Sequence, residues 1–120
     1  MIYTTYFAKL RKLPNNIEPI SIAIYPIRNW SGKQYKKLAP TAQILSDYKK
    51  TGDEIAYTEK YQTRLSRLDA NEVVKELRAL AKDKDIALVC YEKPSDFCHR
   101  HLVAKWLRAE GYEVEEFVEK

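Results

Sequence analysis

The chain contains few of the residues that would define several common protein classes. Among its 120 residues there are 3 glycines, 2 cysteines and 1 methionine. Two cysteines do not make the disulfide framework of a small secreted protein, so we expect a reducing compartment and a cytoplasmic location. There is no glycine-rich phosphate loop and no Cys-x-x-Cys redox pair. No apolar stretch approaches transmembrane length and no signal peptide is expected at the N-terminus, so no membrane association is predicted.

Length and composition predict one domain that spans residues 1–120. A hydrophobic share of 45% and a charged share of 32% are ordinary for a folded protein with a well-solvated surface. The formal net charge of +4 is compatible with an anionic ligand. It falls short of the dense basic patch that is typical of a nucleic-acid-binding protein.

Hydrophobic patterns predict strands and helices in the order of an α/β protein. Runs of β-branched and aromatic residues predict strands at 2–8, 20–25, 86–91 and 112–118. Capping residues and periodic apolar positions predict helices between Thr41 and Gly52, within 57–68, after Asp69 and over 98–110. The continuous apolar run at 86–91 is typical of a strand buried on both faces of a parallel sheet. We therefore predict a single three-layer domain, with a small, mostly parallel sheet flanked by helices.

Reactive side chains are concentrated in residues 90–100, Cys-Tyr-Glu-Lys-Pro-Ser-Asp-Phe-Cys-His-Arg, at a predicted strand-to-helix turn. Helical periodicity directs Cys98, His99 and Arg100 over the end of the sheet, and His101 toward solvent. Glu92 follows the strand, at the edge where open α/β sheets bind ligands. A carboxylate, a thiol, an imidazole and a guanidinium are therefore expected to converge, which is the composition of an acid–base or nucleophile site.

The start of the last helix favours a reactive cysteine. Ser95 or Asp96 is expected to cap this helix, whose N-terminal N–H groups and dipole favour an anion or a thiolate. Cys98 should therefore be the reactive thiolate, whereas Cys90 should remain a shielded thiol in the strand. We also expect the long loop 26–40 to cover the site, because loops of this length usually serve a function or are disordered.

Each of these residues also has a structural interpretation. Cys90 and Cys98 could pack as small core residues, and His99 could bond a backbone carbonyl or Glu92. Arg100 could form a structural ion pair with Glu92 or Asp96. A zinc site from the cysteines, His99 and Glu92 is conceivable, but consecutive Cys98 and His99 would project about 100° apart on a helix. The usual paired ligand spacing is also missing, so no metal is predicted.

The run Cys90-Tyr-Glu92-Lys-Pro94…Cys98-His99-Arg100 resembles the signature of the DUF488 family, a set of small bacterial, archaeal and phage proteins without an assigned function. The segments 6–10, 20–23 and 30–40 are also similar to its short members. The resemblance covers nearly the whole chain. It implies an α/β fold and a shared site at Cys90, Glu92, Cys98, His99 and Arg100, and it brings no established reaction.

Three hypotheses of function follow. The first is an enzyme acting on a small anionic or nucleotide-like substrate. Its catalytic residues would be Glu92, Cys98, His99 and Arg100. Its substrate-binding residues would be Arg28, Trp30, Lys93 and Cys90. The second is a non-catalytic nucleic-acid or nucleotide-binding module that uses the Arg100 corner with Arg28, Trp30, Lys33, Lys36 and Lys37. The third is a structural corner in a partner-binding protein. The mixture of side chains favours the enzyme, and the sequence identifies no cofactor.

Overall fold

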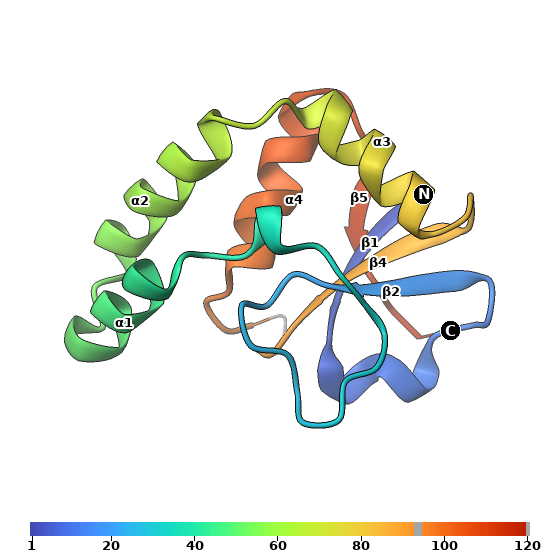
Figure 1. Ribbon diagram of the computed structural model, residues 1–120, viewed down its shortest axis with the longest axis horizontal. Coiled ribbons are helices and arrows are strands. Elements are labelled where there is room, and N and C mark those ends of the chain that lie inside the picture. Colours follow the sequence, from blue (N-terminus) through green and yellow to red (C-terminus); the bar gives the residue numbers. More distant parts are fainter. Residues whose placement is uncertain (93–94, 120) are drawn as a thin grey trace.

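The computed structural model describes residues 1–92 and 95–119 and has a parallel β-sheet at its centre (Figure 1). Every strand pairs in parallel with its neighbours, in the order β3-β2-β4-β1-β5. The sheet therefore has a single carboxyl edge, at which all the strand ends meet. The strands are β1 (Ile2–Tyr6), β2 (Ile17–Ser21), β3 (Lys33–Gln34), β4 (Asp85–Cys90) and β5 (Val114–Glu116).

The four α-helices of the described residues lie on one side of the sheet, where the third and fourth pack against its strands and the second packs against the first and the fourth. They are α1 (Ala42–Thr51), α2 (Glu54–Ser66), α3 (Ala70–Leu80) and α4 (His99–Ala109). These helices connect strands that advance toward β5, whereas the connections from β1 to β2 and from β2 to β3 run the other way. Connections between parallel strands are right-handed, so connections that advance along the sheet in opposite directions lie on opposite faces of it. The 3-10 helix η1 (Phe7–Lys12) accordingly lies on the other face, and a second one, η2 (Lys36–Leu38), precedes α1 (Figure 1).

The core has two parts, one on each face of the sheet. Ile86, Leu88 and Cys90 of β4 belong to the main cluster, with apolar residues of the α-helices. Val89 belongs to a smaller cluster with residues of η1 and of the loop after β2. Because side chains alternate along a strand, β4 is buried on both faces, as its apolar run predicts. The three-layer α/β prediction is confirmed.

Strand β2 begins earlier than its hydrophobic run predicts. It covers Ile17–Ser21 rather than 20–25, and it includes Pro19. The N–H of Ile22 donates to the carbonyl of Val89 on β4. Successive residues of a parallel strand direct their backbone groups alternately to its two neighbours, so the odd-numbered residues of β2 direct theirs toward β3. Pro19 is one of these, and β3 pairs only with Ile20 and Ser21. The strand therefore tolerates proline because no neighbouring strand needs its missing N–H.

Two other predicted segments also differ from the structure. The first strand ends at Tyr6, because Phe7–Lys12 forms η1. The segment 26–40 is not one loop, since it contains the edge strand β3 and the 3-10 helix η2. None of the helices among residues 1–92 and 95–119 is both long and apolar enough to cross a membrane.

The N-terminus of α3 provides a test of the local sequence signals. Asp69 accepts hydrogen bonds from the N–H groups of Asn71 and Glu72, at 2.9 and 3.2 Å. Replacing Asp69 by Ala should lower the free energy of unfolding by about 1 kcal/mol, because it leaves these donors without their acceptor. Urea denaturation would measure the loss. Asp69→Asn should retain most of the stability, and equal losses in the two variants would contradict the capping role.

Candidate functional site

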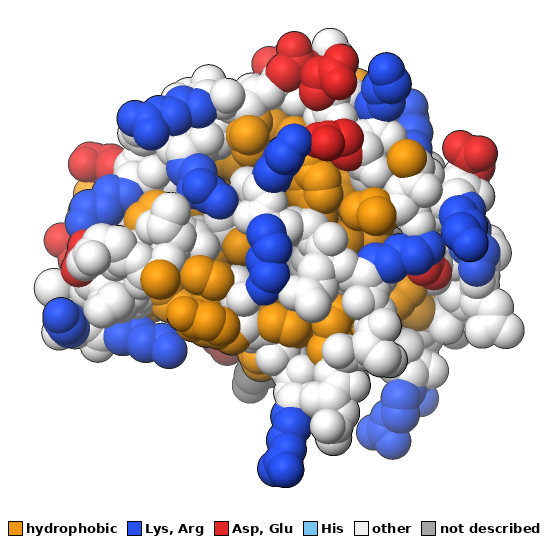
Figure 2. All heavy atoms as spheres, in the orientation of Figure 1, with side chains coloured by type: hydrophobic (Ala, Val, Ile, Leu, Met, Phe, Trp, Pro, Cys, Tyr) orange, Lys and Arg blue, Asp and Glu red, His pale blue; other side chains and the backbone are white. Residues whose placement is uncertain are grey.

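A cavity of about 320 Å³ opens at the carboxyl edge of the sheet, over the ends of β2 and β4. Figure 2 shows hydrophobic side chains at the surface between α1 and the loop that follows β2. Both of these segments contribute to the cavity, together with α2 and the turn between β4 and α4. The lining is mostly apolar and aromatic, with residues Ala23, Ile24, Tyr25, Pro40, Leu45, Tyr48, Lys49, Tyr57, Cys90, Tyr91, Glu92, Phe97, Cys98 and His99.

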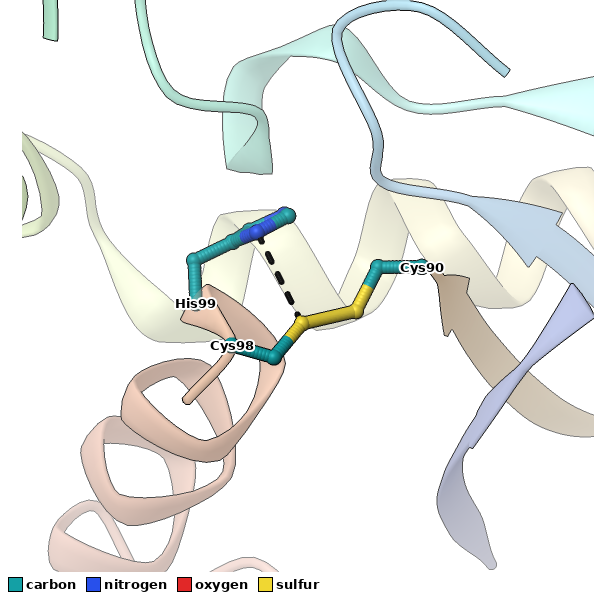
Figure 3. Close-up of side chains that lie close together, drawn as sticks. All are labelled: Cys90, Cys98 and His99. Carbon is teal, nitrogen blue, oxygen red and sulfur yellow. Dashed lines mark hydrogen bonds between the residues drawn. A yellow bond between two sulfur atoms is a disulfide. The ribbon is translucent and has the colours of Figure 1, made fainter. Parts of the chain in front are cut away.

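The two cysteines meet at this cavity and form a disulfide (Figure 3). Cys90 is the last residue of β4, and Cys98 directly precedes α4. Their side chains are buried, with 1% and 4% of the residue exposed, although both line the cavity. The expectation of one reactive and one shielded thiol is therefore replaced by a bonded pair. Sequence spacing alone does not indicate this pairing, because it depends on how close the start of α4 lies to the end of β4 in the folded protein.

Cys98 occupies the N-cap position of α4 and does not belong to the helix. Its backbone is extended, with φ −155° and ψ 142°, and its side chain accepts no capping hydrogen bond. The predicted caps, Ser95 and Asp96, both lie before this position. Because Cys98 is outside the helix, the angle of about 100° between consecutive helical residues does not describe how Cys98 and His99 are oriented. Both side chains instead point toward the same space (Figure 3).

His99 is held in one orientation by a backbone carbonyl and an aromatic ring. Its Nε2 lies 2.7 Å from the carbonyl oxygen of Ile22, and its ring packs edge-on against Tyr61 at 5.4 Å. The carbonyl can only accept, so Nε2 carries the hydrogen and Nδ1 keeps its lone pair. Nδ1 lies 3.9 Å from the Sγ of Cys98. Burial lowers the pKa of His99 to about 4, so the imidazole is neutral at pH 7.

Arg100 is fully buried and has partners on several elements. Its Nε and Nη2 donate to the two carboxylate oxygens of Glu116 on β5, at 3.1 and 3.0 Å. Its Nη1 donates to the backbone carbonyl of Glu92 and to the Sγ of Cys90, the latter at 3.2 Å. The guanidinium also lies over the ring of Tyr6, at 5.6 Å. Arg100 thus lies close to Glu92, as expected, but it contacts the backbone and not the carboxylate.

This arrangement corrects the role that the sequence suggests for Arg100. A guanidinium that is fully buried and bound to Glu116 is not free to hold a substrate anion. The partner Glu116 was missed, although the sequence carries a signal for it. Glu116 lies two positions after Val114, so both face the helices, and a carboxylate on a buried face requires a cationic partner. The side chain of Glu92 is exposed and lines the cavity.

Two of the remaining predicted residues, Arg28 and Trp30, do not join the cavity. Trp30 packs against Phe7 at 5.4 Å, on the face opposite the α-helices, and its indole N–H donates to the carbonyl of Lys33. Neither Trp30 nor Arg28 lines the cavity, because the chain crosses to that face after β2. The expected lid is therefore wrong for these two residues. Lys93 lies outside the described residues.

His101 also differs from its expected position. Helical periodicity predicts that it faces solvent, but it is half-buried, and its Nε2 is shielded from solvent without a hydrogen-bond partner among the described residues. Burial, followed by the nearby charge of Arg100, lowers the pKa of His101. The start of α4 is thus more enclosed than its sequence periodicity indicates.

A family model described as the active DUF488-N3 subclade matches residues 5–111. The chain belongs to the DUF488 family. The match includes both cysteines, His99 and Arg100, but it ends before Glu116, which pairs with Arg100. No curated protein and no solved structure matches the chain.

Substitution of Arg100 should destabilise the whole fold. Arg100→Ala removes a buried cation and leaves the half-buried carboxylate of Glu116 without its partner, so the free energy of unfolding should fall by about 3–5 kcal/mol. Chemical denaturation would measure this loss. Lys105→Ala, at an exposed position of the same helix, should change the stability by no more than about 0.5 kcal/mol. A similarly small effect of Arg100→Ala would contradict the proposed importance of the ion pair.

The buried histidine should make stability depend on pH. The pKa of His99 is about 4 in the folded protein, whereas an unfolded histidine titrates near its ordinary value of about 6.5. Between these values the unfolded state binds more protons, so acid favours unfolding. The contribution of His99 is present above about pH 6.5 and should be lost as the pH falls toward 4, by roughly 3 kcal/mol in total.

Denaturation of the disulfide-bonded protein between pH 4 and 8 would measure this dependence. His99→Gln keeps an amide donor for Ile22 but cannot titrate, so its stability should fall less over the same range. Arg100 and His101 are the charged neighbours that further lower the pKa of His99, and both remain in the variant. Identical pH profiles for the two proteins would show that another group governs acid unfolding.

Proposed function

We propose that this DUF488 protein is an enzyme that reduces the S–S bond of a small, anionic, ring-bearing disulfide with a pair of cysteine thiols. The observation that carries the proposal is the bond between Cys90 and Cys98 at an aromatic cavity, with the guanidinium of Arg100 against one sulfur. A cysteine pair that only stabilises a fold has no need of a cavity or of a buried cation. The description of the matching subclade as active agrees with a catalytic role.

Cys90 is the better nucleophile of the pair. Its Sγ lies 3.2 Å from Nη1 of Arg100, whose charge is permanent. A neighbouring cation lowers the pKa of a thiol and increases the fraction of reactive thiolate. Among residues 1–92 and 95–119, Cys98 has no such contact, and Nδ1 of His99 is 3.9 Å from its sulfur. This assigns to Cys90 the role that the sequence suggested for Cys98.

Cys98 completes the reaction as the resolving cysteine. The thiolate of Cys90 attacks an electrophilic sulfur of the substrate and releases the first part of the substrate as a thiol. The thiol of Cys98 then displaces the second part, and the Cys90–Cys98 disulfide forms. The substrate gains two electrons and two protons, which the two thiols lose. An external dithiol must restore the reduced enzyme, and the cytoplasmic location that we propose supplies such reductants.

The cavity lining supports a flat, anionic substrate. Tyr25, Tyr48, Tyr57 and Phe97 provide aromatic surfaces that suit a planar ring such as a nucleobase. Lys49 lines the cavity, and α4 begins beside it, so both add positive potential near the cysteines. Nδ1 of neutral His99 keeps a lone pair beside the sulfur of Cys98, so it can accept a hydrogen bond from the thiol before the second step.

The alternative, a nucleic-acid-binding module, has less support. Figure 2 shows Lys and Arg side chains spread over this face and mixed with acidic ones. Lys33 pairs with Glu18 at 2.8 Å, and Lys37 pairs with Glu76 at 2.9 Å. Lys36 donates to the backbone carbonyls of residues 23 and 24. These lysines are engaged within the protein, so they offer little free charge to a phosphate backbone.

The proposal can be tested with dithiobis(nitrobenzoate), which is an aromatic, anionic disulfide. The reduced protein should release two thionitrobenzoate anions per chain and end as the Cys90–Cys98 disulfide. Cys98→Ser should release only one and should retain a nitrobenzoate adduct on Cys90, because no second thiol can displace it. Absorbance would follow the release, and mass spectrometry of peptides would locate the adduct.

Cys90→Ser is the matched control. Its remaining thiol lacks the guanidinium contact, so it should be less ionised and should react more slowly with the reagent than the thiol of Cys90 does in Cys98→Ser. Equal rates for the two single-cysteine variants would remove the argument for Cys90. A wild-type protein that carries two stable adducts and forms no disulfide would contradict the resolving role of Cys98.

A further inference from the structure

We propose that, in its reduced state, the chain binds a thiophilic divalent cation such as Zn²⁺ through Cys90, Cys98 and His99. The ligand atoms of these three residues all lie within 4.8 Å of one another, and all three side chains are buried. Figure 3 shows the two sulfurs and the imidazole facing one another across this small space. Two thiolates and one imidazole form a ligand set that zinc commonly takes in proteins.

The orientation of His99 supports a ligand role independently of the cysteines. Its Nε2–H donates to the carbonyl of Ile22, which leaves the lone pair of Nδ1 directed at the sulfurs. Metal-binding histidines usually donate their other ring N–H to a carbonyl or carboxylate, and this contact fixes both tautomer and orientation. The histidine is therefore already arranged as a ligand, and binding a cation requires no rotation of the ring.

The spacing of the cysteine backbones also suits an ion between the sulfurs. The two Cα atoms are 7.6 Å apart, beyond the range of about 4.4–6.8 Å that disulfides usually span. Two thiolates on one tetrahedral zinc ion lie roughly 3.8 Å apart, since each Zn–S bond is about 2.3 Å. Reduction followed by metal binding would let the sulfurs separate while the backbone stays in place.

The surroundings provide charge balance and an open coordination position. Two thiols lose their protons to solvent when they bind the cation, and Arg100 donates a hydrogen bond to the sulfur of Cys90. Three protein ligands leave a fourth tetrahedral position, and the cavity lies beside all three residues. The expectation that no metal binds rested partly on helical geometry at Cys98, which the extended backbone of that residue does not have, and partly on the missing paired ligand spacing.

Metal binding and the proposed reductase chemistry use the same sulfurs in different states. A bound cation would hold both thiolates, so the metal-loaded enzyme would have no free nucleophile. Binding itself does not rest on the proposed reaction, because it requires only the reduced cysteines and His99. Zinc would then regulate the enzyme by masking its thiols, while the disulfide would exclude zinc.

Titration of the reduced protein with Co²⁺ under anaerobic conditions tests the site directly. One equivalent should produce thiolate-to-cobalt charge-transfer absorption and the visible bands of tetrahedral Co²⁺, and Zn²⁺ should remove both. The disulfide-bonded protein should give neither signal. This comparison needs no substitution, so it cannot fail through misfolding of a variant. Absence of the bands from the reduced protein would overturn the proposal.

Two matched histidine variants test the ligand set. His99→Gln should raise the Kd for Co²⁺ by at least about tenfold, whereas His101→Gln should leave it unchanged. Equal affinities for these variants would exclude His99. Zn²⁺ should also slow the release of thionitrobenzoate from the reduced wild-type protein. If the cobalt bands form but the reduced protein never resolves its adduct into a disulfide, the metal site stands and the proposed reductase function fails.

Discussion

The buried guanidinium of Arg100 connects the elements on which the site depends. From the first turn of α4 it reaches Glu116 on β5, the turn after β4 and the ring of Tyr6 on β1. Burying this charge is costly, and the cost is offset only while both oxygens of the carboxylate and the other acceptors stay in position. The start of α4 is therefore fixed on the sheet. The same guanidinium donates to the sulfur of Cys90, so the residue that holds α4 on the sheet also contacts the proposed nucleophile.

The parts of the fold that follow from local signals could be predicted from the sequence. Thr41 and Gly52 bound α1, and Asp69 starts α3, because capping depends on residues within one turn. The unbroken apolar run of β4 indicates burial on both faces, and the parallel sheet follows from the alternation of strands and helices. The presence of a cavity beside the turn between β4 and α4 also agrees with this pattern, because open parallel sheets form crevices at their carboxyl edge.

The internal geometry of the site could not be predicted, because it depends on contacts between distant segments. The ion pair of Arg100 joins α4 to β5, and His99 donates to the carbonyl of Ile22, which directly follows β2. Helical periodicity also fails at Cys98, because the helix begins only at the next residue. Trp30 has an aromatic ring that could stack on a ligand, but it packs against Phe7 on the face of the sheet opposite the α-helices. Burial of an aromatic side chain and exposure to a ligand have similar sequence signals.

The order of the strands explains why a cavity exists at this place. After β2 the chain leaves toward β3 on one face, whereas after β4 it leaves toward β5 on the other. The two chain segments diverge from adjacent strands, and a crevice opens between them at a topological switch point. Its existence depends on the path of the backbone, and its chemistry depends on the side chains at its edge. A DUF488 protein that lacks both cysteines but keeps this strand order would retain a binding crevice without thiol chemistry.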